Sequence, residues 1–404
     1  MRKRFFQGLG VNVFLLGLVS LLTDLSSEMV LPILPMYITS LGGTAFAVGL
    51  IGGLGDSVAS ALKVLSGYWS DRFGARKPFV FWGYGLSAVA KLSLAFSTVW
   101  QHALISRSAE RVGKGLREAP RDAIIADSAE PQVRGKAFGL HRAMDTTGAI
   151  GGSLMAFVLF WYFDFGFEVI ILACAGVAFV ALVPFFRIAE VRREPQERGL
   201  GISFRALPKR LKWFIVIATI FALGNFTYMF FVLRAQDAFG GVVSEKAAVA
   251  IAILLYALYN VVYALLSIPA GVLSDRVGRG KVLTLGYVLF GLTCLGFAFL
   301  HSTAAFVVLF ILYGLVSALV VGVERAFACD LAPEAVRGTA LGTFHTSIGL
   351  VALPAGLIAG ALWENVGSWA TFTCGGGLGL AAGVLMLWFY ASSRAEGQRQ
   401  CTDE

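Results

Sequence analysis

Charged side chains are scarce in this chain. Asp, Glu, Lys and Arg make up 14% of its 404 residues, and hydrophobic residues make up 57%. Soluble proteins contain about 25% charged and about 45–50% apolar residues. The composition therefore leaves no room for a soluble domain, and it indicates a protein whose helices lie in a lipid bilayer.

Cysteine is also rare, with five residues in the whole chain. Four of them lie within long apolar stretches, and no pair has the spacing of a metal site, so we expect neither disulfides nor a cysteine-based metal site. The sequence also lacks a nucleophile–base set or a metal-ligand set of the spacing that catalysis requires. We therefore expect no enzyme activity, no catalytic residue, no metal site and no cofactor.

Long apolar runs are abundant. A membrane-spanning helix needs roughly 20 mostly apolar residues. The sequence supplies twelve candidate stretches, with approximate limits 11–39, 45–70, 79–98, 102–126, 136–162, 166–186, 213–235, 246–272, 282–300, 304–328, 337–362 and 368–391. We therefore predict an all-α membrane protein with twelve transmembrane helices.

One long polar segment interrupts this pattern. Residues 187–212 are rich in Arg, Glu, Pro and Gly, which is typical of a solvated connector. We interpret the segment as a cytoplasmic linker. The predicted organisation is a six-helix bundle over residues 1–186, the linker, and a second six-helix bundle over residues 213–404.

The net charge of +8 is explained by the distribution of basic residues between the two sides of the membrane. Most Lys and Arg residues fall in the amino-terminal segment, in residues 187–212 and in every second loop, whereas the alternate loops hold few. Because basic residues concentrate in cytoplasmic loops, we expect both termini in the cytoplasm. We predict a monomer in the cell membrane, with lipid around it and no nucleic acid partner.

A short motif occurs twice in the chain. The two copies, 204 residues apart, read Gly67-Tyr-Trp-Ser-Asp71-Arg72-Phe-Gly74 and Gly271-Val-Leu-Ser-Asp275-Arg276-Val-Gly278. A second pair of segments, around Asp127 and Asp330, recurs at an offset of 203 residues. Two halves repeated in parallel are typical of one large group of secondary transporters.

The first copy resembles the loop signature between the second and third helices of the major facilitator superfamily, Gly-x-x-x-Asp-Arg-x-Gly followed by bases. Ala75 departs from the pattern, in which a base comes directly after the last glycine. The resemblance extends over roughly residues 10–392. It implies two six-helix bundles related by pseudo-two-fold symmetry around a central cavity, and it is nearest to the prokaryotic drug and metabolite carriers of the superfamily.

The repeated loops favour a role as a cytoplasmic gate. Asp71 should lie near the amino end of the stretch that begins at residue 337, where the helix dipole favours an anion, and the bases after each copy can pair with Asp127 and Asp330. Such contacts would hold the cytoplasmic side closed. The predicted gate residues are Gly67, Asp71, Arg72, Gly74, Asp127, Gly271, Asp275, Arg276, Gly278 and Asp330.

The stretch 102–126 is unusual because it carries eight charges, namely Arg107, Glu110, Arg111, Lys114, Arg117, Glu118, Arg121 and Asp122. Each central charge costs roughly 2.5–3.5 kcal/mol on an insertion scale. The stretch must therefore line a water-filled cavity or pair its charges with neighbours. Its string from Arg111 to Gly115 resembles the superfamily signature Arg-x-x-Gln-Gly, with Lys114 in place of Gln. The resemblance implies that Arg111 takes part in proton coupling or anion binding.

Two carboxyl groups stand out in the first stretch. Asp24 and Glu28 are four residues apart, so both lie on one face of the helix, near the middle of the span. Desolvation penalises the charged form of such groups, and intramembrane acids usually have a function. We interpret the pair as a site for a coupled proton or a cation. A fixed salt bridge with the stretch 102–126 is the alternative.

Further candidates lie on other predicted helices. Asp56 and Lys63 share one stripe of the stretch 45–70, and they either pair with each other or contact the substrate. Asp145 in the first half and two asparagines in the second half can complete the cavity. The predicted substrate or proton-coupling residues are Asp24, Glu28, Asp56, Arg111, Lys114, Glu118, Asp145, Asn225 and Asn260.

Together these features predict a secondary transporter that moves a small solute by alternating access, coupled to protons, with efflux of a drug or metabolite favoured. The bases of the stretch 102–126 favour an anion, whereas Asp24 and Glu28 favour a cation. Import of an organic anion or of an iron-like metal complex therefore stays open. An alternative from a different class of function is a transport-inactive sensor or scaffold with the same fold. This alternative predicts an added soluble domain or a long cytoplasmic tail.

Overall fold

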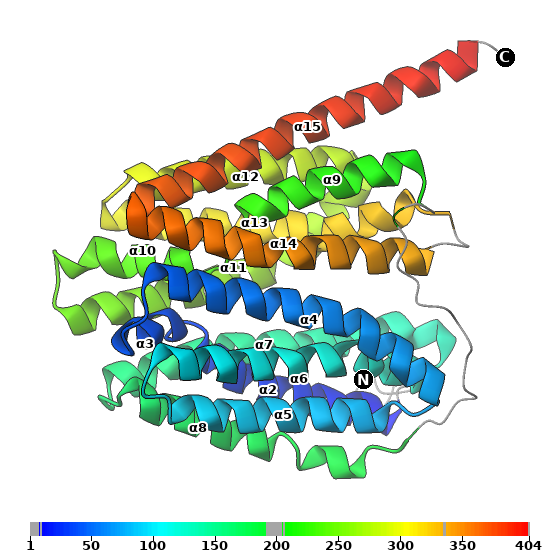
Figure 1. Ribbon diagram of the computed structural model, residues 1–404. Coiled ribbons are helices and arrows are strands. Elements are labelled where there is room, and N and C mark those ends of the chain that lie inside the picture. The colour runs from blue at the N-terminus through cyan, green and yellow to red at the C-terminus, as the bar shows by residue number, and fades with distance from the viewer. Residues whose placement is uncertain (1–7, 9, 191–203, 205–206, 334–336, 403–404) are drawn as a thin grey trace.

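The computed structural model describes residues 8, 10–190, 204, 207–333 and 337–402, and it describes the side chains of these residues except for 131 and 393–402. Helices connected by short loops make up this part of the chain (Figure 1). Most of the predicted linker 187–212 lies outside the described residues.

The helices of the first half are α2 (Val11–Val30), α3 (Leu34–Ser40), α4 (Ala45–Phe73), α5 (Lys77–Ala95), α6 (Trp100–Asp127), the 3-10 helix η1 (Pro131–Val133), α7 (Arg134–Trp161), α8 (Phe167–Val180) and the 3-10 helix η2 (Pro184–Arg187). Those of the second half are α9 (Lys209–Gly224), α10 (Met229–Gly240), α11 (Glu245–Val277), α12 (Arg279–Phe299), α13 (Thr303–Asp330), α14 (Arg337–Asn365) and α15 (Ser368–Thr402). Each of the twelve predicted stretches is found as a helix or as a pair of consecutive helices.

Ten segments of the described chain are long and apolar enough to cross a membrane. Two of them combine consecutive elements, α8 with η2 and α9 with α10. The two remaining long helices are α5, which contains the buried Lys91, and α6, which carries the eight charges. Both pack inside the first half, where α5 contacts α6 and α8, and α6 contacts α4.

Two predicted spans are broken, which the sequence analysis did not anticipate. The stretch 11–39 ends its first helix at Val30, and α3 starts only at Leu34. Pro32 lies in the gap, and proline favours a break in a helix because it lacks an N–H group and its ring clashes with the preceding turn. The corresponding stretch of the second half, 213–235, breaks after Gly224 and resumes at Met229.

The helices form two groups that meet along two seams. In Figure 1, α2 to α8 lie in the lower part of the molecule, and α9 to α15 lie in the upper part. Between the groups, α4 packs on α14, and α7 packs on α11. The division into the domains 1–186, 187–212 and 213–404 is compatible with this arrangement and stays a prediction.

The α4–α14 seam depends on close backbone contact. A Cβ atom added at Gly49 would lie 2.1 Å from the carbonyl oxygen of Gly356, and one added at Gly356 would lie 2.2 Å from that of Gly49. The Ser57 hydroxyl also donates a hydrogen bond to the carbonyl of Gly349, at 2.6 Å. These contacts close the molecule at the end of α4 near Ala45.

We expect Gly356→Val to lower the free energy of unfolding by about 1–3 kcal/mol, the usual cost of overpacking. The matched control is Gly176→Val, because Gly176 is exposed on α8 and a Cβ there meets nothing within 4 Å. The control should stay within about 0.5 kcal/mol of the parent. Denaturant unfolding in detergent micelles measures both, and equal effects would contradict a tight α4–α14 seam.

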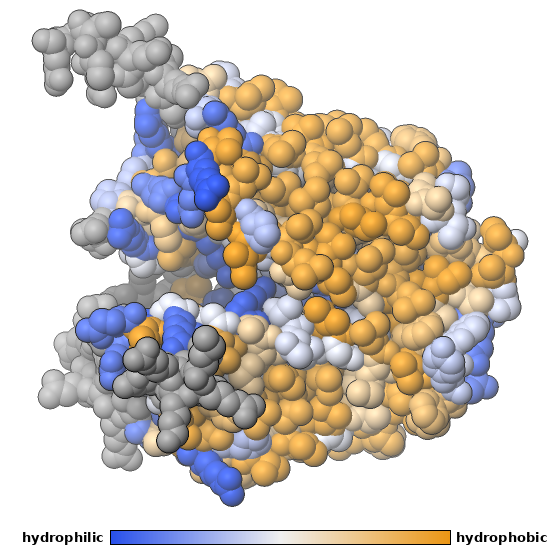
Figure 2. Space-filling view, turned by 180° about the vertical axis from the view of Figure 1, so that it is seen from behind, coloured by the Kyte–Doolittle hydropathy of each residue, from blue (hydrophilic) through white to orange (hydrophobic). Residues whose placement is uncertain are grey.

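The opposite end of the molecule is open. Away from Gly49 and Gly356, α4 and α14 diverge towards Phe73 and Arg337 (Figure 1). Figure 2 shows the surface hollowed between the two groups of helices at this end. A Cβ added at Gly338, in the first turn of α14, would meet nothing within 4 Å. The open end carries the loops at Gly74 and Gly278, on the side predicted to be cytoplasmic.

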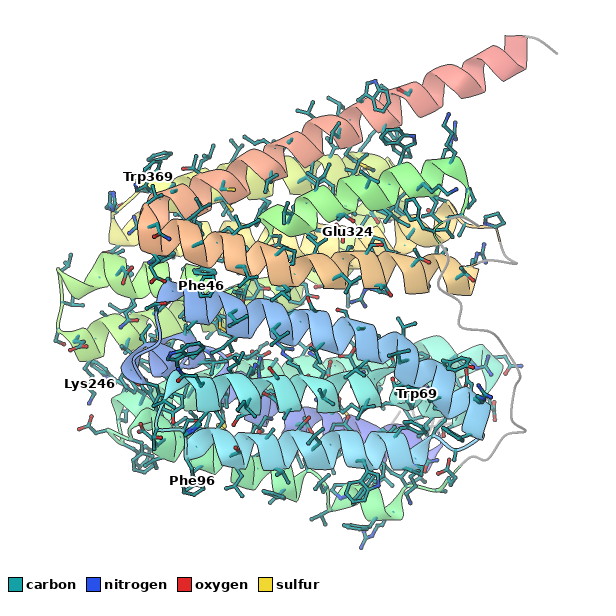
Figure 3. All side chains as sticks on the ribbon, viewed as in Figure 1. Phe46, Trp69, Phe96, Lys246, Glu324 and Trp369 are labelled. Atoms are coloured by element: carbon teal, nitrogen blue, oxygen red, sulfur yellow. The ribbon has the colours of Figure 1, made fainter. Side chains whose placement is uncertain are left out.

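An apolar surface covers much of the molecule (Figure 2). It includes exposed side chains such as Leu265, Ile268 and Val384, which are 69%, 78% and 65% exposed. Exposed aromatic residues lie towards both ends of the helices: Phe46, Phe96 and Trp369 at one end and Trp69 at the other (Figure 3). Aromatic side chains at both boundaries of an apolar belt are typical of a membrane-embedded protein.

Candidate functional site

A cavity of about 650 Å³ lies between the two groups of helices. Its lining comes from α2, α4, α5, α6 and α7 of the first half and from α11 and α13 of the second half. The first half supplies almost all of the charged side chains. The second half presents small or neutral groups such as Asn260, Tyr263 and Ser267, with Arg325 as its charged contributor.

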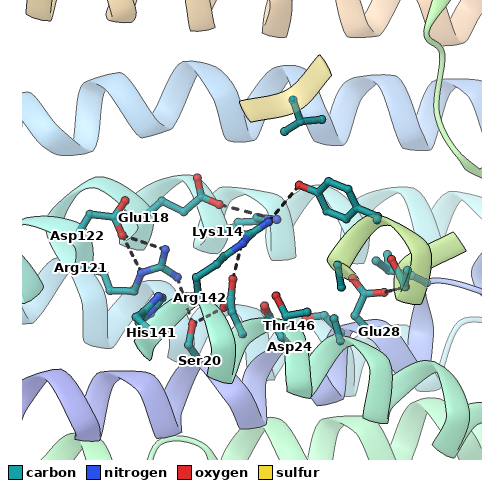
Figure 4. A pocket seen from close by; sticks show the side chains of 18 of the residues that line it. Ser20, Asp24, Glu28, Lys114, Glu118, Arg121, Asp122, His141, Arg142 and Thr146 are labelled. Carbon is teal, nitrogen blue, oxygen red and sulfur yellow. Dashed lines mark hydrogen bonds and ion pairs between the residues drawn. The ribbon is translucent and has the colours of Figure 1, made fainter. Parts of the chain in front are cut away.

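Eight bases and six acids line this cavity. The bases are Lys63, Arg107, Arg111, Lys114, Arg117, Arg121, Arg142 and Arg325, and the acids are Asp24, Glu28, Glu110, Glu118, Asp122 and Asp145. The expectation that the charged stretch 102–126 lines a cavity agrees with this geometry. Figure 4 shows the charges of α6 facing those of α2 and α7 across the cavity.

The charges of α6 are arranged in ion pairs. Arg107 pairs with Glu110, and both side chains are nearly fully buried. Arg121 contacts Asp122 at 2.9 Å. Arg117 bonds to the Ser87 hydroxyl at 2.5 Å and lies over the Tyr84 ring. The ion pairs of Arg107 and Arg121 therefore lie within α6 itself, whereas Arg117 contacts α5.

Of the two alternatives for Asp56 and Lys63, the one in which they pair with each other is wrong. Asp56 instead pairs with Arg111 at 3.2 Å, and Lys63 pairs with Glu118 at 2.9 Å. Residues seven positions apart lie about 10 Å from each other along a helix, whereas α6 packs directly against α4. Each charge therefore finds a nearer partner on α6. Its partner Arg111 lines the cavity, whereas Asp56 itself does not.

Lys114 is the least constrained base of α6. Its amino group lies 3.8 Å from Glu118, whose second oxygen holds Lys63, and its side chain is 44% exposed. Arg142 on α7 is similarly open, with 62% of its side chain exposed. These two bases face the open cavity and are available to a solute.

Glu28 lies at the junction of the two halves. The Tyr256 hydroxyl and the Asn260 amide, both on α11, donate hydrogen bonds to its carboxylate at 3.0 and 3.1 Å. Asn260 also donates to Ser153 on α7, at 3.2 Å. The structure thus brings Glu28 and Asn260 together across the α7–α11 seam. The fixed salt bridge that was considered for Glu28 is replaced by these two neutral donors.

Asp24 lies one turn before Glu28 and faces α7. Asp24 and Asp145 both line the cavity. Asp145 also accepts a hydrogen bond from the Ser20 hydroxyl at 2.9 Å and pairs with Arg142 at 3.3 Å. Asp24 and Asp145, which the sequence analysis treated separately, therefore belong to the wall of one cavity.

Asn225, like Asp56, is a predicted site residue that does not line the cavity. It ends α9 at the break in that span, is exposed, and does not belong to the cavity lining. The helical pattern of 213–235 placed it on a continuous helix. Because the chain breaks after Gly224, that periodicity does not apply at Asn225.

Lys91 is a buried base that sequence reasoning missed. It is 1% exposed, and its amino group donates to the hydroxyls of Ser26 and Ser27 on α2, at 2.8 and 2.9 Å. Ser27 lines the cavity, and Lys91 lies directly behind it. A lysine inside the otherwise apolar stretch 79–98 is the signal that identifies it, since intramembrane bases are rare.

The two repeated loops have matching geometry. Gly74 and Gly278 end α4 and α11 with positive φ angles of 62° and 104°, where glycine carries no Cβ penalty. The base two positions after Gly74, Arg76, bonds to Asp71 at 2.9 Å and also pairs with Asp127.

The second copy repeats this arrangement. Arg279 bonds to Asp275 at 3.0 Å and to Asp330 at 2.6 Å. The pairings with Asp127 and Asp330 are the ones that the sequence indicated, whereas those with Asp71 and Asp275 were not predicted. The remaining motif residues, Gly67, Arg72, Gly271 and Arg276, lie on the same two helix ends. The predicted approach of Asp71 to the start of α14 is not seen in this structure, where Asp71 bonds to Arg76, and the gating role stays a prediction.

We expect Asp71→Lys to reduce transport at least tenfold and to leave solute affinity in detergent within about twofold. The substitution places a second positive charge beside Arg76, and like charges at this distance repel. Arg76 lies in the loop and not in the cavity lining. Transport assays and binding to purified protein test the prediction, and a parallel loss of affinity would exclude a gate.

Comparisons with known proteins agree with this architecture. The family model described as Major Facilitator Superfamily matches residues 16–244 and 214–400. The chain therefore belongs to the major facilitator superfamily and is a membrane transporter of that class. The resemblance noted in the repeated loop is confirmed.

Two relatives show how far the similarity extends. An uncharacterized MFS-type transporter of Methanocaldococcus jannaschii is 48% identical over 384 residues, which cover 94% of this chain and 95% of that protein. The multidrug resistance protein MdtH of Aeromonas hydrophila is 31% identical over 193 residues, which cover 46% of this chain and 47% of that protein. The second similarity concerns about half of each chain.

Solved structures share the fold. The nucleoside transporter NupG matches with a TM-score of 0.79 and 16% identity, over 94% of this chain and 99% of that chain. A peptide transporter, POT, in complex with sulfate matches with a TM-score of 0.78 and 15% identity, over 96% of each chain. Sequence identities this low show that the fold is shared and give no information about the substrate. The predicted all-α fold with twelve transmembrane helices is confirmed.

Proposed function

We propose that this protein is a secondary active transporter that exports a small drug or metabolite across the cell membrane by alternating access, coupled to protons. Its two halves move against each other around the central cavity, with no cofactor and as a monomer. Both termini face the cytoplasm, and the loops at Asp71 and Asp275 form the cytoplasmic gate.

The observation that carries this proposal is a charged cavity open at one end and sealed at the other. The α4–α14 backbone contact and the Glu28 hydrogen bonds to α11 close one end. At the other end, the cavity with Asp24, Glu28 and Asp145 in its wall is hollowed towards the surface (Figure 2). Such an arrangement presents acidic groups to one side of the membrane at a time, which proton coupling requires. The name of the MdtH relative supports export of drugs.

A second candidate is the transport of an organic anion or an anionic metal complex. Its support is the exposure of Lys114 and Arg142, whereas the acid Glu28 is held by two donors. Exposed bases in a partly desolvated cavity attract anionic groups. A transport-inactive sensor or scaffold has no comparable observation in its favour.

Transport by purified protein in proteoliposomes tests these alternatives. We name four probes: ethidium as a cationic dye, uridine as a neutral solute, citrate as an organic anion and ferric citrate as a metal complex. The proposal predicts that an imposed pH gradient drives ethidium or uridine and that a protonophore abolishes this movement. Gradient-driven movement of citrate or ferric citrate alone would assign the second candidate. Failure of all four probes would support the sensor or scaffold.

The proposed orientation has its own test on α6. His102 lies near one end of this helix and Ser128 follows its other end. In a background without native cysteines, His102→Cys should label with an impermeant reagent from outside the cell, and Ser128→Cys should label from the cytoplasm. Labelling of both positions from the same side would contradict a membrane-spanning α6.

A further inference from the structure

The connector between the two halves is fastened to the first half where it begins. Residues 184–190 follow α8 and lead to the start of α5, beside the loop at Gly74. Phe185 and Ile188 are buried, at 0% and 1% exposure, in a cluster with apolar residues of α2, α5 and α6. Burial of these two side chains anchors a segment that the sequence pattern assigns to a solvated connector.

Hydrogen bonds hold the same segment from two helices. The Asn12 side chain, at the start of α2, donates to the Ala189 carbonyl at 3.1 Å and accepts from the Ala189 N–H group at 3.0 Å. Lys77, in the first turn of α5, donates to the Ile188 carbonyl at 2.5 Å. These bonds place the next residue, Glu190, at the amino end of α5.

Glu190 caps α5 from outside the helix. Its carboxylate accepts hydrogen bonds from the backbone N–H group of Arg76 at 3.0 Å and from that of Lys77 at 3.2 and 3.3 Å. The first N–H groups of a helix have no partner within it, and the Arg76 side chain supplies no cap. A carboxylate at this end is also favoured by the helix dipole.

The capped residue is the base of the predicted cytoplasmic gate. The guanidinium group of Arg76 pairs with Asp71 on α4, at 2.9 Å, and with Asp127 on α6. The Arg76 side chain is only 12% exposed, so water would replace these bonds poorly if the main chain shifted. Glu190 fixes that main chain and, through it, the base that holds Asp71.

The second copy of the motif lacks such a cap. Arg279 takes the place of Arg76 and pairs with Asp275 and Asp330. In the part of the chain that the structure describes, no carboxylate accepts from the first N–H groups of α12. The Arg279 side chain is 26% exposed, more than twice the value for Arg76. The two loops therefore match in their ion pairs, and Glu190 acts on the first loop alone.

We propose that Glu190 is a positioning residue of the cytoplasmic gate, which holds Arg76 in the orientation that keeps Asp71 away from the second half. This statement rests on the gating role in the proposed function. In the structure, which is open on this side, Asp71 is bound to Arg76. Closure of the gate moves Asp71 from Arg76 to the start of α14, so a weaker hold on Arg76 favours the closed state.

Hydrogen–deuterium exchange on the purified full chain tests the cap. We expect Glu190→Ala to accelerate exchange at the amides of Arg76 and Lys77 about fivefold, the usual strength of a helix cap, and to leave the loop at Arg279 unchanged. The matched control is Glu130→Ala, because Glu130 is an exposed acid just before η1 in the same half. Unchanged exchange at Arg76 in Glu190→Ala would overturn the cap.

A cap without a role in the gate would alter exchange alone, so a second measurement follows the gate itself. Spin labels on the exposed residues Gln132 and Pro333, in the segments before α7 and α14, report the separation of the two halves. We expect Glu190→Ala to raise the short-distance population about threefold to fivefold. Glu190→Gln, which keeps an acceptor oxygen, should restore most of the parent distribution, and Glu130→Ala should not change it. An unchanged distribution in Glu190→Ala would overturn the positioning role.

The effect should pass through Arg76. In Arg76→Gln the base that holds Asp71 is absent, so adding Glu190→Ala should change the short-distance population by less than about 1.5-fold, as for two residues that act through one contact. Equal effects of Glu190→Ala with and without Arg76 would exclude this route.

Transport then separates this inference from the proposed function. If the parent moves a probe with the pH gradient, Glu190→Ala should lower the maximal rate about threefold to fivefold. Solute affinity should stay within about twofold, because Glu190 does not line the cavity. Lower affinity at an unchanged maximal rate would contradict the positioning role. If the parent moves none of the probes while exchange and distances behave as stated, the positioning of Arg76 stands and the export function fails.

Discussion

Replacing Glu110 by Gln should lower the free energy of unfolding by about 3–5 kcal/mol, because it leaves Arg107 charged and buried without its partner. Arg107 is 2% exposed, and the side chain of Glu110 is 7% exposed. Lys91 is buried behind the same part of the cavity wall, so the lost negative charge is not compensated locally. Equilibrium unfolding in mixed micelles measures the change.

The matched control is the double variant Arg107→Met with Glu110→Met. Removing both charges eliminates the desolvation cost, and replacing a buried pair by apolar side chains of similar volume is often neutral. We therefore expect the double variant to be more stable than Glu110→Gln alone. If Glu110→Gln costs less than about 1 kcal/mol, water reaches Arg107 and the burial described above is wrong.

Replacing Tyr256 by Phe should shift the conformational equilibrium roughly tenfold to a hundredfold away from the state seen here. The tyrosine hydroxyl donates to Glu28 across the two halves at 3.0 Å. A hydrogen bond to a charged group contributes about 1.5–3 kcal/mol, and about 1.4 kcal/mol corresponds to a factor of ten. Loss of this contact weakens the seal at the closed end.

Tyr259→Phe is the matched control for this experiment. Its hydroxyl accepts a hydrogen bond from Ser317 at 3.3 Å, within the second half alone. Spin labels on the exposed residues Phe163 and Val242, in loops of different halves at the closed end, report the separation between them. We expect longer distances in Tyr256→Phe and none of this change in Tyr259→Phe. Equal distributions in both variants would exclude the proposed seal.

The sequence was sufficient to predict the class of protein and the number of its transmembrane helices. Three features can be read from the sequence without a structure because they depend on local composition. They are the apolar stretches of spanning length, the recurrence of the loop around Asp71 at Asp275, and the distribution of bases along the chain. The placement of the charged stretch 102–126 against a cavity follows from the same reasoning, since its charges cannot face lipid.

Of the nine residues predicted for the substrate or proton-coupling site, seven line the cavity. Asp24 and Glu28 share a helix face because they are four residues apart. Lys91 was overlooked although a lone lysine in an apolar stretch was visible, and Asn225 was placed in the cavity although the span around it breaks after Gly224. Helical periodicity assigns residues to a face only if the helix is unbroken, and it does not predict where a helix breaks.

Only the tertiary structure decided which charged groups meet. Asp56 pairs with Arg111 instead of Lys63, Glu28 bonds to Tyr256 at a separation of 228 residues, and Asp145 bonds to Ser20 at a separation of 125 residues. Spacing along a helix fixes the face on which a side chain lies, but the rotation of that helix and the identity of its neighbour depend on packing. Close contacts such as that of Gly148 with the Leu21 backbone set those rotations. The pairing of buried charges is therefore a property of the packed helices and not of any single one.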